Sequence, residues 1–494
     1  MYAQGAWIPP GTSARIYSFA PRSREVAPRT VAIVGAGFSG TVLAINLLRL
    51  PHEQPLRVVL VDRAQMARGV AYARRRYPYL LNVPAGRMSA SSADPEEFLA
   101  FARRKLPGAT AEDFLPRELY GDYLESSLAT AATAAPPHVR LERLHGAVIA
   151  LERPHRSGVV DVHLHDCRKV TADTVVLAPG NPPPAPLKGS QALRGTRCYI
   201  DEPWAAPSAF RAGETVLVVG TGLTMADIAL AGSTAARGKA VIHALSRHGL
   251  IAPPQTTFAA LSAEHNTGEL LQAATRSIRQ LLRAIRALCD NLELRGGDWR
   301  EGITVARQIA PALWQRLSMR ERRRFLRHAR AYWDVHRHRL PESTWFALNE
   351  LRRRGSLHVH AGRLLDLEPL GRRIRVTWRA RGQGTKTLVV DRVVNCTGPD
   401  HDVRRSREPL LRSLVLQGAA VPDPLALGLV TDESGALVDA SGRVSEQVYY
   451  LGPLLRPRYW ETTAVQELRA HAEHLACHLT AWGAVRSENV RVRS

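Results

Sequence analysis

The feature that most constrains the fold of this chain is a glycine-spaced turn at residues 35–40. The β-branched run Val31–Val34 leads into Gly35-x-Gly37-x-x-Gly40, and a segment with helical spacing follows. In such a turn the first glycine permits the tight bend, the second lets a pyrophosphate approach the backbone, and the third lets helix and strand pack closely. Asp62 ends the next apolar run about 20 residues on, where a ribose hydroxyl needs an acceptor. The spacing predicts a Rossmann-type nucleotide-binding unit.

A second glycine turn occurs in the middle of the chain. The run Thr215–Val219 leads into Gly220-x-Gly222, and Met225 stands where the third glycine would be, so we expect looser packing of helix on strand. Two such turns imply two nucleotides. The strand after this turn ends in Ser246-Arg247, and an arginine beside a hydroxyl suits the 2′-phosphate of NADP, whereas NAD would favour an acid. The alternative is that Arg247 is only an exposed surface residue.

The order of these patterns predicts how the chain is divided. Apolar runs entering glycine turns at Gly180 and at Gly398-Pro399 read as returns from one domain to the other. Residues 265–355 have mostly helical patterns, with one amphipathic helix expected over 270–294 and a further helical stretch over about 303–337. We therefore predict an α/β protein with two Rossmann-like domains and a helical insertion. Its expected parts are a mobile leader (1–28), the first part of one nucleotide-binding domain (29–205), a second nucleotide-binding domain (206–264), the helical insertion (265–355) and the second part of the first domain (356–494).

Composition excludes several classes of protein. No apolar run of about 18 residues is present, so we expect no membrane span, and the N-terminus lacks a signal-peptide pattern. The five cysteines are far apart and form no CxxC pair, which indicates a reducing cytoplasm and argues against a zinc or dithiol centre. His336 and His338 lie two residues apart, on different faces of a helix, so no metal site is expected. Oligomeric state cannot be read from the sequence.

The net charge of +22 raises the question of nucleic acid. Many of the arginines cluster between residues 276 and 354, in the helical region, where arginine usually forms a solvated helix face. We therefore expect no nucleic-acid partner, and keep an RNA-associated flavoprotein only as the alternative from another class.

Several segments together resemble a bacterial family of FAD/NAD(P)-binding flavoproteins, distantly similar to the flavin-containing and N-hydroxylating monooxygenases. The matching segments span roughly residues 30–480. They are Gly69–Tyr72, Leu81–Ser89, Pro116–Leu124, Asp201–Trp204, Gly220–Asp227, Leu245–Arg247, Trp333–Arg339, Asn395–Pro399, Gly452-Pro453 and Trp460–Ala464. A clear FxGxxxH-type fingerprint of the better-known flavin monooxygenases is lacking. Some members of the family are associated with urate hydroxylation, so a purine is one substrate class that the resemblance allows.

The resemblance implies FAD at the first glycine turn and NADPH or NADH at the second. The flavin ring would reach residues 82–89, and the turn at Gly452 would place a helix beginning near Glu461 beside it, where a helix N-terminus stabilises negative charge on the reduced ring. The residues expected to bind a cofactor at the FAD end are Gly35, Gly37, Phe38, Ser39, Gly40, Asp62, Arg63, Asn82, Val83, Met88, Ser89, Gly452, Trp460, Glu461 and Thr462, and the returns between the domains add Gly180, Gly398 and Pro399 as cofactor contacts. The expected NAD(P)H contacts are Gly220, Gly222, Leu223, Thr224, Ser246 and Arg247.

The function expected from the sequence is therefore that of an FAD-dependent, NAD(P)H-using monooxygenase. Its partners would be O₂ and a small molecule, such as a purine-like compound of the urate type. The alternative within the same class is an NAD(P)H oxidase or reductase that transfers no oxygen. Because the cofactor carries the chemistry, no catalytic side chain can be assigned from the sequence.

Overall fold

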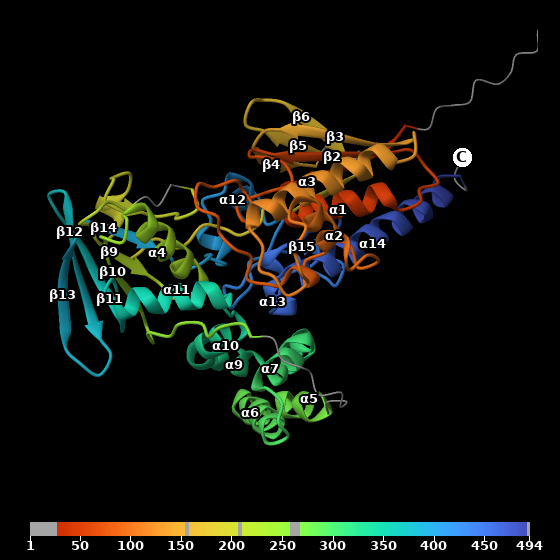
Figure 1. Ribbon diagram of the computed structural model, residues 1–494. Helices are drawn as coiled ribbons and strands as arrows, with labels where there is room; N and C mark the ends of the chain where they lie inside the picture. Colours follow the sequence, from red (N-terminus) through yellow and green to blue (C-terminus); the bar gives the residue numbers. More distant parts are fainter. Residues whose placement is uncertain (1–26, 154–157, 206–209, 257–266, 492–494) are drawn as a thin grey trace, which may run out of the picture.

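The computed structural model describes residues 27–153, 158–205, 210–256 and 267–491. Within them, two large sheets, a small three-stranded sheet and several groups of helices make up the fold (Figure 1). The expected leader, residues 1–28, lies almost wholly outside the described residues. Among the helices that the structure describes, none has the length and apolar character needed to cross a membrane.

The first sheet has six strands in the order β15-β16-β7-β1-β2-β3. All neighbouring pairs are parallel except β15 with β16. Its central strands are β-branched runs that are buried on both faces, as expected of a parallel sheet. The strands are β1 (Arg29–Val34), β2 (Leu56–Asp62), β3 (Val139–His145), β7 (Thr174–Leu177), β15 (Ala436–Val438) and β16 (Val444–Tyr450).

Helices cover one face of this sheet, and a small sheet covers much of the other. The helical face shares one apolar core with α1 (Phe38–Arg49), α2 (Glu97–Lys105), α3 (Arg117–Ala134) and α14 (Val465–Arg491). The opposite face packs on a three-stranded sheet and a helix, namely β4 (Val148–Glu152), β5 (Val160–Leu164), β6 (Lys169–Ala172) and α12 (Pro409–Leu416). The two ends of the described chain therefore meet where α1 packs against α14 (Figure 1).

The second sheet has seven strands in the order β13-β12-β11-β10-β9-β14-β8. It is parallel from β11 to β8, and β12 and β13 add an antiparallel hairpin. The helices α4 (Leu223–Ala235) and α11 (Glu342–Arg353) pack on one of its faces. The strands are β8 (Tyr199–Ile200), β9 (Thr215–Val219), β10 (Val241–Ser246), β11 (Leu357–Leu370), β12 (Arg373–Ala380), β13 (Thr385–Val390) and β14 (Arg392–Asn395).

This topology corrects the expected domain boundaries. The prediction ended the NAD(P)-type domain at residue 264 and assigned residues 356–494 to the FAD-type part. Instead β11–β14 (357–395) hydrogen-bond into the second sheet, and β8 (199–200) lies at its edge. The physical reason is strand pairing: β11 is parallel to β10, and β14 is parallel to β9, although the helical insertion separates the members of each pair in the sequence. Only after β14 does the chain return to the first sheet, through β15 and β16.

The helical insertion forms a separate group of helices below the two sheets in Figure 1. It contains α5 (Thr267–Arg276), α6 (Ile278–Leu294), α7 (Trp299–Gln308), α8 (Ala310–Arg316), α9 (Met319–Arg324), a π-helical turn (Phe325–Ala329) and α10 (Arg330–Arg337). The single helix expected over 270–294 is wrong, because it breaks at Ser277, whose hydroxyl accepts a hydrogen bond from the Gln280 amide as the cap of α6. The insertion packs on the short α13 (Arg456–Tyr459), where Trp314 Nε1 donates to the Pro457 carbonyl (2.8 Å).

Candidate functional site

The three glycines of the first turn have different surroundings. Gly35 has φ +109°, and a Cβ there would lie 2.1 Å from the Ala178 carbonyl oxygen. A Cβ on Gly40 would lie 1.9 Å from the carbonyl oxygen of Gly35. A Cβ on Gly37 would meet nothing closer than Gly69 Cα, at 3.8 Å. Backbone packing therefore requires glycine at 35 and 40, whereas position 37 faces open space that a ligand could fill.

The residues after this turn leave a helix N-terminus free. Gly37 caps α1 without a side-chain hydrogen bond, and Phe38 and Ser39 are buried in the first turn. Asp62, at the end of β2, accepts hydrogen bonds from the amides of Ala36 (2.6 Å) and Ala64 (2.8 Å) and so braces the turn. Arg63 points to another partner: it forms a two-contact ion pair with Glu408 (2.9 and 3.0 Å).

The second turn repeats the first in its geometry. Gly220 also has φ +109°, and its Cβ would lie 2.2 Å from the Cys396 carbonyl oxygen. A Cβ on Gly222 would have no atom within 4 Å. Leu223 and Thr224 form the first turn of α4. Each turn thus has one glycine that the neighbouring strand requires and one that faces open space.

The end of β10 carries more positive charge than the sequence reading assigned to it. Ser246 Oγ accepts from Thr221 Oγ1 (2.8 Å) and from the Gly249 amide (3.0 Å), so Ser246 fixes the turn, while Arg247 is exposed. Arg381, from the β12–β13 hairpin, donates to His248 Nδ1 (3.2 Å). Burial and the charges of Arg381 and Arg247 lower the pKa of His248. Arg381 was missed because it is far from Arg247 in the sequence and is brought here only by sheet pairing.

The loop expected beside a flavin ring is tied to α14. Asn82 and Val83 are half-buried, whereas Met88 and Ser89 are buried. Ser89 Oγ donates to the carbonyl of Ser91 (3.0 Å), and Arg469 of α14 donates to the Ser89 carbonyl (2.9 Å). Residues 82–89 thus lie against the C-terminal helix even though the two segments come from opposite ends of the sequence.

The two segments that cross between the sheets lie side by side. Gly180 (φ +78°) and Gly398 (φ +84°) both have left-handed backbones with no atom within 4 Å of a Cβ. Pro184 and Pro399 form an antiparallel bridge, and the Asp400 amide donates to the Pro183 carbonyl (3.1 Å). The outgoing and returning chains therefore form one double connection.

Residues 452–462 pack against the helical insertion. Gly452 (φ +138°) turns the chain, and Trp460 (φ +58°) stacks on Trp314 with the ring centroids 4.9 Å apart. Thr462 Oγ1 donates to the Pro453 carbonyl (3.1 Å). The helix expected to begin near Glu461 begins at Val465 instead, because Glu461 and Thr462 use their side chains for buried contacts before the helix starts.

Glu461 is the acid of a buried ion pair. Its carboxylate contacts Arg337 Nη2 (2.5 Å) and accepts from Trp333 Nε1 (2.9 Å), and both charged side chains are only 6% exposed. His338, beside Arg337, has a pKa lowered well below its usual value by burial, with Arg337 the next cause. His336 bonds to the Tyr332 carbonyl at the surface, so the two histidines of this motif do not face one site.

Four further arginines gather around this pair. Arg300 pairs with Asp298 (2.9 Å), Arg307 pairs with Glu467 of α14 (2.5 Å), and Arg456 lies over the Trp460 ring (4.0 Å to the centroid). Arg339 has no acidic partner among the described residues. Arg337 and Arg339 belong to the segment Trp333–Arg339, which carries part of the family resemblance, whereas the other three arginines come from distant positions in the chain and were missed.

A buried ion pair joins the two sheet units. Arg117 is the first residue of α3 and contacts Asp227 of α4 (2.7 Å). Their side chains are 18% and 13% exposed. Burial raises the pKa of Asp227, and Arg117 opposes that shift. Trp204 lies between the units, with the Arg117 guanidinium 5.5 Å from its ring centroid.

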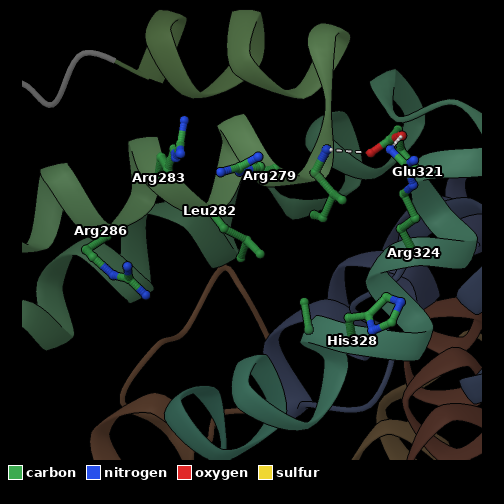
Figure 2. A pocket seen from close by; sticks show the side chains of 9 residues that line it. Arg279, Leu282, Arg283, Arg286, Glu321, Arg324 and His328 are labelled. Carbon is green, nitrogen blue, oxygen red and sulfur yellow. Dashed lines mark hydrogen bonds and ion pairs between the residues drawn. The ribbon is translucent and has the colours of Figure 1, made fainter.

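The helical insertion also carries a cavity of about 580 Å³ on its own surface (Figure 2). Arginines of α6 line one wall, and Arg324 with His328 lines the other. Glu321, its acidic member, pairs with Arg324 (2.7 Å) and accepts from the Ile278 amide (3.0 Å). This cavity contains none of the residues expected from the sequence to bind a cofactor.

Comparisons with known proteins agree with this geometry. Residues 32–182 match a family model described as FAD-NAD(P)-binding. No curated protein matches the chain significantly. Among solved structures, L-lysine 6-monooxygenase from Pseudomonas syringae superposes with a TM-score of 0.61 at 16% identity, over 91% of this chain and 98% of that one. Ornithine N-hydroxylase from Kutzneria sp. 744, solved with reduced FAD, NADP⁺ and L-ornithine, gives 0.59 at 16%, over 92% and 100%.

A reductase shares the same general architecture. The bacillithiol disulfide reductase from Staphylococcus aureus superposes with a TM-score of 0.54 at 10% identity, over 92% of this chain and 98% of that chain. The predicted fold class is confirmed, as is the distant relationship to N-hydroxylating flavoproteins at the level of fold. Residues 32–182 match the FAD-NAD(P)-binding family model, and the chain as a whole shares the fold of the lysine and ornithine hydroxylases.

Proposed function

We propose that this protein is an FAD-dependent, NADPH-using monooxygenase that acts on a small molecule. The observation that carries the proposal is the pair of matching glycine turns, each with one position, Gly37 or Gly222, whose missing side chain leaves open space at a helix N-terminus. Such a terminus binds phosphate groups through its free amides. The fold shared with the lysine and ornithine hydroxylases supports the same reading.

In this proposal the first sheet unit holds FAD. The α1 amides beside Gly37 bind the pyrophosphate, and residues 82–89 together with Gly452–Thr462 border the ring, between α14 and the helical insertion. Bound FAD supplies the redox chemistry, with NADPH as the reductant and O₂ as the oxidant. The protein's own part is to position the two nucleotides and to exclude water. The insertion does so by packing Trp314 against Trp460 of residues 452–462.

The second unit holds NADPH. Gly222 and the N-terminus of α4 would accept its pyrophosphate, and Arg247 with Arg381 would meet the 2′-phosphate. Two guanidinium groups at the end of β10, with no carboxylate at Ser246 or Arg247, favour a phosphate over a bare ribose. The domain assignment that fits this scheme joins residues 29–182 and 399–494 into the FAD unit and gives β8–β14 to the NADPH unit.

The substrate class is the open part of the proposal. The lysine and ornithine hydroxylases, and a cadaverine monooxygenase from Erwinia amylovora, act on small amines by name. Urate is the purine that the family resemblance suggests. All five cysteines are free, which fits an enzyme of the reducing cytoplasm.

A substrate screen tests the proposal. FAD-loaded protein is given NADPH and O₂ together with L-lysine, L-ornithine, cadaverine or urate, and NADPH consumed, H₂O₂ formed and hydroxylated product are all quantified. A monooxygenase forms product in proportion to the NADPH consumed with one substrate. H₂O₂ matching NADPH with every compound would establish the oxidase reading instead. Salt-sensitive RNA binding by the FAD-loaded protein, with no hydroxylated product from any compound, would support the alternative of an RNA-associated flavoprotein and contradict this proposal.

A further inference from the structure

We propose that Arg339, in the short segment that joins α10 to α11, binds an anionic group of the substrate, a carboxylate or similar oxyanion. The proposal rests on the proposed function and names the substrate class that the same site would take. It starts from one feature of the described residues, a half-buried guanidinium group that forms no ion pair with a carboxylate.

The environment of Arg339 lacks a free acid. Its Nε and Nη1 atoms are buried and have no hydrogen-bond partner. The carboxylate that acts on it, Asp298, is already held by Arg300 through contacts of 2.9 and 3.1 Å. Burial, together with the charges of Arg300, Arg307 and Arg87, lowers the pKa of Arg339 to about 10. Burying a cation among other cations raises the free energy of the folded protein. Binding of an anion beside it would lower that free energy.

The neighbouring arginines are already partnered, which singles out Arg339. Arg300, Arg307 and Arg337 each pair with a carboxylate, and Arg456 lies over the face of Trp460. Among these five arginines of the described chain, Arg339 alone has neither an acid nor an aromatic ring recorded against its guanidinium group. A planar guanidinium offers parallel N–H donors that match the two oxygens of a carboxylate.

Charges from two distant parts of the chain act on Arg339. Arg87, which acts on it electrostatically, belongs to residues 82–89, the loop proposed to border the flavin ring. Arg307, also acting on it, is tied to α14 through Glu467. Arg339 therefore lies within electrostatic range of α7 and of the 82–89 loop.

Small anions test this site without knowledge of the substrate. FAD-loaded protein is titrated with benzoate and acetate, and in parallel with their neutral amides, benzamide and acetamide, while the flavin spectrum and melting temperature are recorded. The anions should perturb the flavin spectrum and raise the melting temperature, and the amides should do neither. Arg339→Gln should weaken anion binding by at least about tenfold, since a charged hydrogen bond is lost. Arg339→Lys should recover part of it.

A control variant in the same helical region excludes a general charge effect. Arg283→Gln removes an exposed arginine of α6, in the surface cavity of Figure 2, and should leave anion binding unchanged. Equal responses to anions and amides, or equal loss in both variants, would overturn the proposal. Flavin content and reduction by NADPH are measured on the same samples, so failure of the proposed function appears as missing flavin or missing reduction, independently of anion binding.

A last arm separates the two sources of oxyanions in this enzyme. The titrations are repeated with saturating NADP⁺. If the site serves a substrate, benzoate still binds and Arg339→Gln leaves the KM for NADPH unchanged. If NADP⁺ abolishes benzoate binding and the variant raises the KM for NADPH, the site belongs to a dinucleotide phosphate and the substrate proposal is overturned.

Discussion

At the scale of single residues, the three glycines of the first turn serve two different purposes. Gly35 and Gly40 are required by backbone contacts, because a Cβ on either would overlap a carbonyl oxygen. Gly37 faces space that the folded chain does not fill. Their effects on folding and on cofactor binding should therefore be separable by substitution.

Gly37→Val should abolish flavin binding and leave the fold intact, because its side chain would occupy the pyrophosphate position. Gly40→Val is the matched comparison and should prevent stable folding. Flavin absorbance after reconstitution reports the first effect, and circular dichroism with thermal melting reports the second. Full flavin retention in Gly37→Val would falsify the assignment of FAD to this turn.

Arg247→Ala should raise the KM for NADPH while leaving the KM for NADH nearly unchanged, because only the 2′-phosphate loses its partner. A charged hydrogen bond contributes roughly 1.5–3 kcal/mol, which corresponds to a KM rise of about 10- to 150-fold. Steady-state kinetics with both cofactors measures the split, and Lys239→Ala, an exposed cation of the same unit, serves as the control. Equal changes for NADPH and NADH would make Arg247 an ordinary surface residue.

At the scale of elements, local patterns were readable and long-range pairing was not. The runs Val31–Val34 and Thr215–Val219 formed strands where expected, because β-branched residues followed by a glycine turn carry their signal within a few positions. The break at Ser277 escaped prediction because the apolar spacing continues across it. A tertiary contact fixes the break: the carboxylate of Glu321, in α9, accepts a hydrogen bond from the Ile278 amide.

The same limit explains the missed parts of the site. Strand β14 lies between β9 and β8, and Arg381 reaches His248 only because β12 follows β11 in the second sheet. Arg300, Arg307 and Arg456 converge from separate parts of the chain and share no motif. Arginine is abundant throughout the helical region, so its buried members could not be told from its exposed ones by sequence alone.

The ion pair between α3 and α4 allows a test at this scale. Arg117→Met leaves Asp227 buried without its partner and should lower the free energy of unfolding by about 3 kcal/mol. The double variant Arg117→Met/Asp227→Leu should recover most of that loss, since neither charge then remains buried. Urea unfolding followed by tryptophan fluorescence measures both. If the double variant is no more stable than the single one, the cost of the unpaired Asp227 charge does not explain the lost stability.

At the scale of the whole molecule, histidines with lowered pKa values make the free energy of unfolding decrease at acid pH. Burial lowers the pKa of His243 to about 4, of His471 to about 4 and of His401 to about 3. In the unfolded chain these groups take up protons near pH 6.5, so the unfolded state binds more protons than the folded state below that pH. Their contribution to stability is complete above about pH 6.5 and is lost as the pH falls toward 4.

The expected outcome is a urea midpoint that decreases steadily between pH 7 and pH 5. His401→Asn, which removes one of the protonation sites, should make that dependence shallower. Asp227 acts in the opposite direction, because its raised pKa favours the folded state as the pH falls, and it reduces the slope only near the acid end. A midpoint that does not change over this range would contradict the burial of these histidines.

The strand order of the first sheet has a consequence for how the chain folds as it is synthesised. Strand β16 pairs with β7, yet the whole second sheet, from β8 to β14, is encoded between them. During synthesis, the edge of β7 that later pairs with β16 therefore keeps unpaired backbone groups until the second sheet and the helical insertion have been made. The second unit can complete its sheet first, and the first unit closes only when β16 and α14 emerge. Nascent chains shortened before residue 444 should accordingly contain one finished unit and one that still needs protection from aggregation.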